Sequence, residues 1–211
     1  MSTGGVVVGP DGRARCPWGV SAPDYQAYHD EEWGRPVHGD DPLFERLCLE
    51  AFQAGLSWLT ILRKRAAFRT AFAGFHIPSV AAFDDDDDVR RLLTDSAIVR
   101  NRAKIEAAVH NARAALGLPG GLDALVWSFT PHSAGRAAPR TSADVPATTP
   151  ESVALAKELR RHGFRFVGPT TAYATMQACG LVDDHLADCH ARGAGAPGQL
   201  SDRGRLAAPF D

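Results

Sequence analysis

The sequence predicts an all-α protein with about eight short helices. Apolar residues recur three or four residues apart through almost all of residues 16–191, which is the spacing of a helix face. Glycines and prolines interrupt this pattern, and no alternating run long enough for a convincing strand occurs. We therefore expect one helical core at 16–191, with flexible, glycine-rich tails at 1–15 and 192–211.

The helices can be assigned in order from their caps and apolar faces. Asp41 is expected to cap the first helix, whose apolar face runs from Leu43 to Ala54 before Gly55 ends it. Ser57 is expected to cap the second. The remaining predicted helices begin near Pro78 or cover 84–93, 105–116, 122–129, 151–162 and 170–179. Residues 131–150, rich in proline, serine and alanine, are expected to form a loop.

Composition limits the class of protein. A chain of 211 residues can bury a core that is stable without disulfides or a metal. The 23 basic and 25 acidic residues balance, which argues against a wholly basic coat that binds nucleic acid nonspecifically. The longest uncharged stretch is too short and polar to cross a bilayer, and the N-terminus lacks a signal-peptide pattern. We expect a cytoplasmic protein with no membrane partner, whose four cysteines are free or bind metal.

Two cysteines and two histidines lie near the ends of the predicted core, Cys16 and His29 at one end and His185 and Cys189 at the other. On a helix, His185 and Cys189 would leave the same face one turn apart. Two Cys with two His form a common closed structural zinc site, which here would join the two ends of the core. Neither a CxxC nor an HxxxH is present, so ordinary cysteines and histidines remain an open alternative.

A carboxylate and a group of aromatic residues suggest a binding pocket. Glu50 falls beside the apolar face of its helix, either as a partly buried functional group or as an edge residue that reaches solvent. The aromatic group consists of Trp18, Tyr25, Tyr28, Trp33 and Trp58. Core packing is the default role of aromatic residues. Because Trp and Tyr cluster here instead of Phe, a stacking pocket for a flat, cationic ligand is the sharper interpretation, and beside Glu50 it would suit a purine.

Charge is segregated along the chain. Residues 89–113 carry six basic and two acidic side chains, whereas residues 24–50 carry two basic and eight acidic ones. The basic turn at 96–104 lies between two predicted helices and is suited to holding a DNA backbone through amides and side chains. Its alternative is an ordinary solvated helix face.

Several motifs resemble those of type I 3-methyladenine-DNA glycosylases, divergent members of the helix-hairpin-helix superfamily. These motifs are RCPWG, YHDEEWGRPVHGDDPLFERLCLEAFQAGLSW, ILRKR, RNRAKI, VWSF and RHGFRFVGPTTAYATMQACGLVDDHLADC. The resemblance extends over nearly the whole predicted core. It implies a helix-hairpin-helix glycosylase fold and hydrolysis of the N-glycosidic bond of 3-methyladenine in alkylated duplex DNA, which leaves an abasic site. We expect a monofunctional enzyme without lyase activity, because no lysine stands in an obvious nucleophile position. We also expect a monomer.

The resemblance also implies roles for particular residues. One structural Zn²⁺ per chain would be bound by Cys16, His29, His185 and Cys189. The catalytic and base-recognition carboxylate would be Glu50, and the pocket aromatics would be Tyr25, Tyr28, Trp33 and Trp58. The hairpin that binds DNA would present Ala97, Arg100, Arg102 and Lys104. Leu56 is our candidate for the wedge that fills the stack when the damaged base is extruded, with core packing as its alternative.

The chain departs from the family pattern in the hairpin, where Ala97 and Ala103 stand in place of glycines that similar proteins often have. This departure leaves open a DNA-binding module that has kept the fold and lost catalysis. A zinc hydrolase acting on another substrate is a third hypothesis. Asp123 is interpreted as a helix-entry residue, so bond cleavage is expected to depend on a weak bond and an oriented pocket more than on a strong general base.

Overall fold

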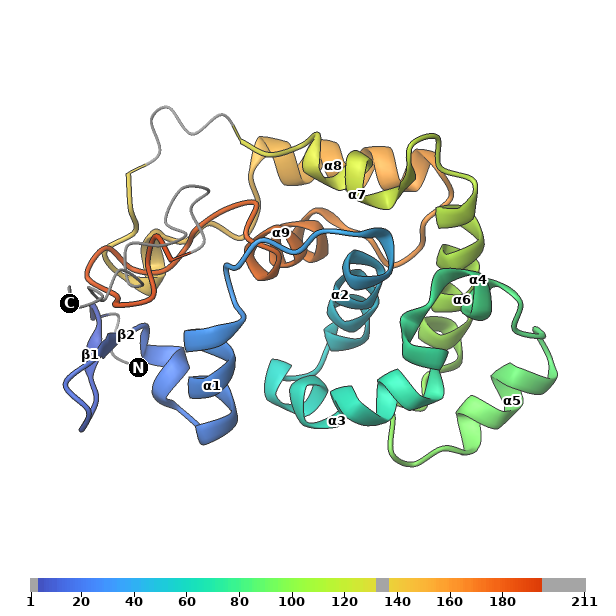
Figure 1. The fold of residues 1–211 in the computed structure, drawn as a ribbon, viewed down its shortest axis with the longest axis horizontal. Helices are drawn as coiled ribbons and strands as arrows, with labels where there is room; N and C mark the ends of the chain where they lie inside the picture. Colours follow the sequence, from blue (N-terminus) through green and yellow to red (C-terminus); the bar gives the residue numbers. More distant parts are fainter. Residues whose placement is uncertain (1–3, 132–136, 195–211) are drawn as a thin grey trace, which may run out of the picture.

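The structure is a computed structural model that describes residues 4–131 and 137–194. Over these residues the chain forms nine α-helices and one short pair of strands, which confirms the predicted helical class (Figure 1). The helices are α1 (Pro23–Glu31), α2 (Asp40–Gln53), α3 (Trp58–Ala71), α4 (Ile77–Ala81), α5 (Asp87–Thr94), α6 (Arg102–Leu116), α7 (Gly121–Trp127), α8 (Pro150–Arg161) and α9 (Pro169–Ala178). Three 3₁₀ turns (Pro17–Val20, Ala73–Phe75 and Ser142–Asp144) and strands β1 (Val7–Val8) and β2 (Ala14–Arg15) complete the elements.

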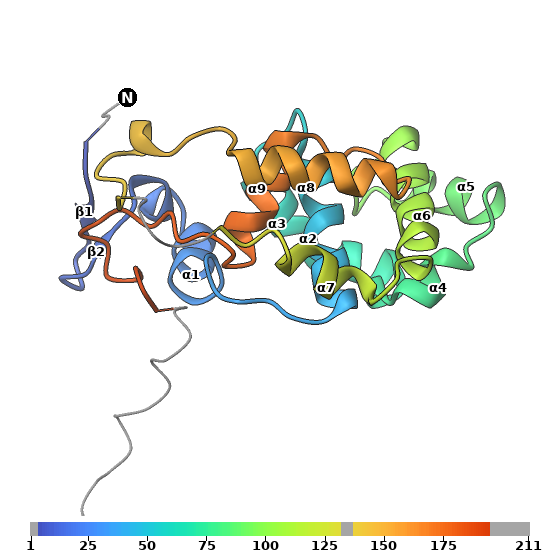
Figure 2. The ribbon, with the colours of Figure 1, turned by 90° about the horizontal axis from the view of Figure 1, so that it is seen from above.

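Helix α2 is the centre of the fold. It packs against α3, α6, α7 and α9, and eight of its residues are buried. Figures 1 and 2 show α4, α5 and α6 at one end of the molecule, and α1 with the strand pair and the last described residues at the other. Segments from the two ends of the sequence therefore meet on the same side of α2 and α9.

Local sequence signals set most helix boundaries. The Ser57 side chain accepts a hydrogen bond from Thr60 N at 3.2 Å, which confirms the predicted cap of α3. Asn101 caps α6 in the same way, and Thr149 and Ser152 form a reciprocal capping box at α8. Helix α2 begins one residue before its predicted cap Asp41, because Gly39, with φ of 93°, turns the chain into the helix.

The N-terminal segment differs from the expected irregular tail. Strand β1 pairs antiparallel with β2, and Arg15 is buried at 1% exposure between Asp11 and Asp30. A buried guanidinium is tolerated here because two carboxylates neutralise it and accept its hydrogen bonds. Of the predicted C-terminal tail, residues 195–211 lie outside the described part of the chain.

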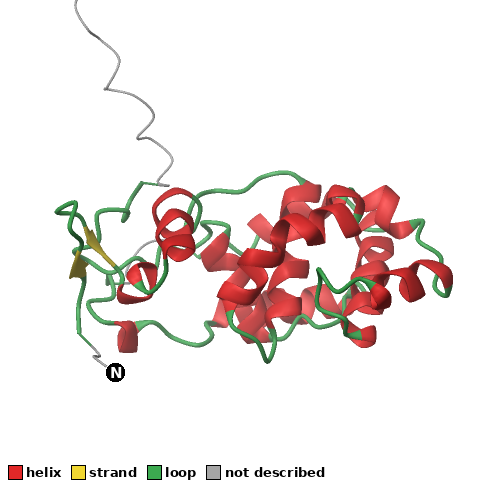
Figure 3. Ribbon diagram, turned by 90° about the horizontal axis from the view of Figure 1, so that it is seen from below, coloured by secondary structure: helices red, strands yellow, loops and turns green. Residues whose placement is uncertain are grey.

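Two further differences concern segments without strong periodicity. Helix α1 is not predicted, since its apolar residues form no clear stripe. The helical arrangement considered for His185 and Cys189 does not occur, because residues 181–190 run as turns and loops. Figure 3 shows the helices, the strand pair and the loops that join them. No helix within 4–131 or 137–194 is long and apolar enough to cross a membrane.

Candidate functional site

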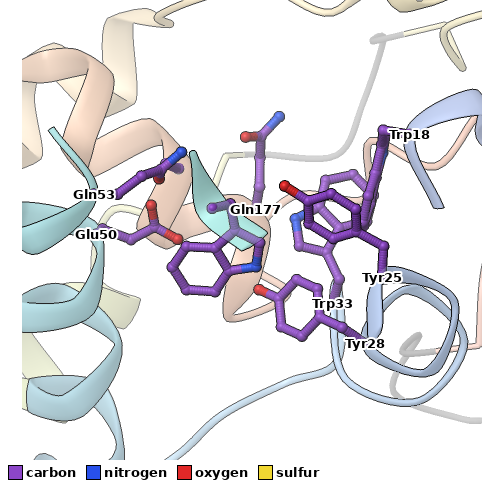
Figure 4. A pocket seen from close by; sticks show the side chains of 9 residues that line it. Trp18, Tyr25, Tyr28, Trp33, Glu50, Gln53 and Gln177 are labelled. Carbon is purple, nitrogen blue, oxygen red and sulfur yellow. The ribbon is translucent and has the colours of Figure 1, made fainter. Parts of the chain in front are cut away.

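An aromatic pocket of about 250 Å³ lies between the N-terminal segment, α2, the start of α3 and α9. It is lined by Trp18, Tyr25, Tyr28, Trp33, Glu50, Gln53, Trp58, Ala174 and Gln177. Figure 4 shows Glu50 and Gln53 on one side of it and the labelled aromatic rings on the other. The structure thus brings the sequence-predicted carboxylate and all five predicted aromatic residues into one cavity.

The aromatic wall is held by contacts among its own rings. Trp18 meets Trp33 edge to face with centroids 5.1 Å apart, and meets Tyr25 in the same manner at 5.7 Å. The Tyr28 and Trp58 rings are tilted with centroids 5.4 Å apart. The hydroxyl of Tyr25 accepts a hydrogen bond of 2.9 Å from the backbone N–H of Leu59, which ties α1 to the start of α3. The rings therefore form a preorganised surface for a flat ligand.

Glu50 lines the pocket and is only 7% exposed, so the alternative of an edge residue in solvent is wrong. No described residue makes a hydrogen bond or ion pair with its carboxylate. Burial raises the pKa of Glu50 to about 8, although the nearby Arg46 guanidinium partly opposes this rise. A buried carboxylate without a partner favours a ligand that brings positive charge or hydrogen-bond donors.

An ion-pair group behind the pocket, absent from the sequence analysis, joins three helices. Glu32, just after α1, accepts hydrogen bonds of 2.5 and 2.8 Å from Arg65 on α3 and one of 3.0 Å from Arg46 on α2. Burial opposes ionisation of Glu32, but these hydrogen bonds lower its pKa to about 2. The group fixes α1, and with it the pocket tyrosines, against α2 and α3. The members of this ion-pair group are 14 and 33 residues apart in the sequence. No local sequence pattern could therefore have predicted the group.

A second cluster contains the predicted metal ligands. Ligand atoms of Cys16, His29 and Cys189 lie within 4.8 Å of one another, and all three residues are buried. The Nδ1 atom of His29 is 2.8 Å from an Asp30 carboxylate oxygen, which leaves Nε2 facing the Cys189 sulfur at 3.4 Å. A carboxylate behind a histidine is the usual way to orient a ring nitrogen toward a metal.

The fourth predicted ligand, His185, lies beside this group. Its ring centroid is 5.0 Å from that of His29, and Asp183 holds its Nδ1 atom at 2.9 Å. Its Nε2 atom is buried without a hydrogen-bond partner among the described residues. Gly34 makes room for the ring, since a Cβ atom there would lie 2.9 Å from Cε1 of His185. The donor set and the orphaned nitrogen fit a tetrahedral cation such as Zn²⁺.

The candidate DNA-contacting residues lie on two turns. Leu56, between α2 and α3, is 42% exposed, so its core-packing alternative is wrong. Ala97, Arg100 and Arg102 are exposed between α5 and the first turn of α6. The amide of Ala97 donates a hydrogen bond to the Asp95 side chain, which shapes the turn.

Lys104 is placed differently from its neighbours in this turn. Its side chain is buried, and its ammonium group donates hydrogen bonds to the backbone carbonyls of Phe52 at 2.8 Å and Ala54 at 2.5 Å. These carbonyls lie at the C-terminal end of α2, where helix carbonyls lack partners. Lys104 therefore joins α6 to the end of α2, and its ammonium group does not face the solvent as a phosphate contact would.

Asp123 lies in the first turn of α7, away from the pocket. Its carboxylate accepts a hydrogen bond from Gly39 N at 3.1 Å, and its own amide donates one to Asp40. These contacts confirm Asp123 as a helix-entry residue. Three pocket residues were missed by sequence reasoning, namely Gln53, Ala174 and Gln177. The signal available for Gln177 was that it is the one amide side chain in α9, a helix without charged residues.

Comparison with known proteins agrees with this architecture. The methyladenine glycosylase family model matches residues 18–192. The chain is 46% identical over 178 residues to the Escherichia coli DNA-3-methyladenine glycosylase 1, covering 83% of this chain and 95% of that protein.

Solved structures give the same result. A crystal structure of a 3-methyladenine DNA glycosylase I superposes with a TM-score of 0.80 at 44% identity, covering 84% of this chain and 99% of that one. A variant of such an enzyme in complex with 3-methyladenine superposes with a TM-score of 0.79 at 35% identity, covering 84% and 97%. From its sequence match and its fold, the chain belongs to the methyladenine glycosylase family.

Proposed function

We propose that this protein is a DNA-3-methyladenine glycosylase, which hydrolyses the N-glycosidic bond of 3-methyladenine in alkylated duplex DNA and leaves an abasic site. The observation that carries the proposal is the buried Glu50 carboxylate in a pocket of aromatic rings. Family membership supports the reaction class, and the pocket chemistry supports the substrate.

The pocket is suited to a cationic purine. Alkylation at N3 gives the base a positive charge, which weakens the bond to the sugar. Aromatic faces attract such a cation, at about 1–2 kcal/mol for a desolvated contact. The ionised form of Glu50 compensates the same charge, so that the damaged base is preferred over neutral adenine by both charge and shape.

Bond cleavage in this proposal depends mainly on binding. The leaving base is already activated by its charge, and a pocket that holds it in a fixed orientation stabilises the separating charges. Glu50 contacts the base and counts as the catalytic carboxylate, while water attacks the sugar. Asp123 does not activate that water, because it lies in the first turn of α7, away from the pocket, and its carboxylate accepts a hydrogen bond from Gly39 N.

The base must leave the duplex before it can enter the pocket, and unstacking costs a few kcal/mol. We assign Leu56 as the wedge that fills the vacated stack, because it is an exposed leucine on the turn that follows Gln53 of the pocket. Ala97, Arg100 and Arg102 are assigned to the phosphate backbone, in the helix-hairpin-helix role. Lys104 is assigned a positioning role instead, on the evidence of its contacts with α2.

We further propose that Cys16, His29, His185 and Cys189 bind one structural Zn²⁺. When bound, the ion would clip the N-terminal segment to the chain after α9, and four protein ligands would leave no open position for a reacting water. The core at residues 16–191 would then act as one unit, in a monomer.

Chromatography of the bases released from methylated duplex DNA tests the proposal directly. We expect the wild-type protein to release 3-methyladenine and to leave an equal number of abasic sites. The DNA strand should be cut at these sites only after alkali is added. Glu50→Gln should abolish release, whereas Glu45→Gln, on the same helix, should retain it.

The other hypotheses predict different outcomes. Tight binding of alkylated or abasic duplex without base release would instead indicate a DNA-binding module. An activity that stops on zinc chelation while the fold persists would indicate a zinc hydrolase.

A further inference from the structure

We propose that Gln177 is a specificity-determining residue, whose amide oxygen selects bases that carry an exocyclic amino group. This inference rests on the proposed function, because it concerns which base the aromatic pocket accepts. Gln177 lies on α9, and its half-buried side chain lines the pocket between Glu50 and Gln53 on one side and Trp18 on the other (Figure 4).

The orientation of the Gln177 amide is fixed from behind. Its Nε2 atom donates a hydrogen bond of 2.8 Å to Oδ2 of Asp184, a residue that is only 2% exposed. The same carboxylate oxygen accepts a hydrogen bond from the hydroxyl of Tyr173. Asp184 thus lies between two donors from α9, and both donors hold it in place.

This contact determines which end of the amide faces the ligand. A carboxylate oxygen accepts hydrogen bonds and does not donate them, so the group beside Asp184 must be the amide nitrogen. The amide oxygen then points away from Asp184. In Figure 4 it lies on the side of Glu50 and Gln53, with the nitrogen on the side of Trp18. No described residue donates a hydrogen bond to this oxygen.

An oriented acceptor discriminates between purines by their exocyclic groups. An adenine-type base offers an amino donor at the six-position, whereas guanine and hypoxanthine offer a carbonyl acceptor there. Two facing acceptors repel and leave both groups unpaired, which makes such sites far more selective than apolar pockets. Asp184 acts on this choice only through Gln177, so it is a positioning residue.

The test compares two free bases, 3-methyladenine and 3-methylhypoxanthine, which differ by an amino group in place of a carbonyl. Binding is measured by quenching of tryptophan fluorescence, since Trp18, Trp33 and Trp58 line the pocket. We expect Gln177→Met to reduce the affinity ratio between the two bases by about five- to tenfold, the value of one hydrogen bond in a partly buried site. Asp184→Asn should reduce the affinity ratio similarly. The new carboxamide can donate a hydrogen bond to the Gln177 oxygen, so the Gln177 amide is no longer fixed with its oxygen toward the ligand.

Tyr173→Phe is the matched control, since it removes a donor to Asp184 and retains the Gln177 contact; its affinity ratio should equal that of the wild type. An unchanged ratio in Gln177→Met, or an equal loss of affinity for both bases, would overturn the inference. If Asp184→Asn does not fold, Gln177→Met decides alone. If the wild-type protein releases 3-methyladenine from DNA but Gln177→Met keeps the affinity ratio between the two bases, this inference is refuted and the proposed function stands. If the wild-type protein neither binds nor releases 3-methyladenine, both are refuted.

Discussion

The Nζ atom of Lys104 lies 2.8 Å from the backbone oxygen of Phe52 and donates a hydrogen bond to it. This contact crosses from the first turn of α6 to the last turn of α2, next to the turn that presents Leu56. A lysine in a basic turn thus supports a neighbouring element, and burial lowers its pKa in the process.

Replacing Lys104 by Met should destabilise the protein by about 2–3 kcal/mol, because carbonyls at the end of α2 would lose a charged donor. Urea denaturation measures this loss. The salt dependence of duplex binding should keep its slope, since Lys104 does not face phosphate. Arg100→Gln is the control, with an unchanged stability and a slope lower by about one. A Lys104→Met protein of wild-type stability with a reduced slope would contradict the structural role.

Glu50→Gln should stabilise the protein in a pH-dependent manner. Burial holds the pKa of Glu50 at about 8 in the folded chain, above its ordinary value of 4.5, so the folded state binds the proton more tightly. Wild-type stability contributed by this group is therefore complete below about pH 4.5 and lost as pH rises toward 8. The advantage of the variant should grow by about 1.4 kcal/mol per pH unit across that window, measured by urea denaturation at several pH values. Parallel pH profiles of the two proteins would refute the buried, unpaired state of Glu50.

The same ionisation should appear in catalysis. If the anionic form of Glu50 receives the cationic base, kcat/KM for base release should rise with pH through about 8, since this parameter reports the free enzyme. Initial rates of base release from methylated duplex DNA, at DNA concentrations well below KM and across pH 6–9, measure this kcat/KM profile. A flat profile would mean that the carboxylate charge is not used.

Leu56→Ala should separate function from stability. Because the side chain is 42% exposed, its truncation should change the free energy of unfolding by no more than about 0.5 kcal/mol. Base release from duplex DNA should fall strongly, while affinity for free 3-methyladenine should remain. Leu116→Ala, an exposed leucine at the end of α6, is the control and should leave both properties unchanged. Equal release by Leu56→Ala and the wild type would remove Leu56 from the extrusion step.

Removal of a metal ligand should lower thermal stability. Cys16→Ala and His185→Ala should each reduce the melting temperature by roughly 5 °C or more and reduce the zinc content from about one ion per chain. Chelation should have the same effect on the wild type. Cys48→Ala changes another buried cysteine, which packs in the main core, and should retain the zinc. Full stability and no zinc in the wild-type protein would contradict the proposed clip.

Much of this molecule was accessible from the sequence alone. The apolar spacing predicts α2, α3, α6, α8 and α9 because helix formation depends on neighbours three and four residues away. Ser57 could be assigned as a cap for the same local reason. The aromatic residues could be grouped because four of the five lie in one short stretch and the last begins the helix after α2.

Other features required contacts between distant parts of the chain. Hydropathy alone could not decide whether Glu50 was buried, since α9 and the N-terminal segment cover it. The ring of Tyr28 had two interpretations, core or pocket, until the wall opposite it was known. His185 and Cys189 lie on turns and loops, so the helical spacing considered for them does not apply. The fold nevertheless brings Cys16, His29 and Cys189 together.

The sequence by itself determined the helical class, the order of the helices and the residue types available for a cationic base. Only the tertiary structure decided the directions of side chains. Lys104 points inward to α2, the Gln177 oxygen points away from Asp184, and Glu50 points into a cavity where no described residue pairs with it. The physical reason is that periodicity follows from the geometry of one helix, whereas burial and hydrogen-bond direction depend on which remote groups exclude water or accept a proton.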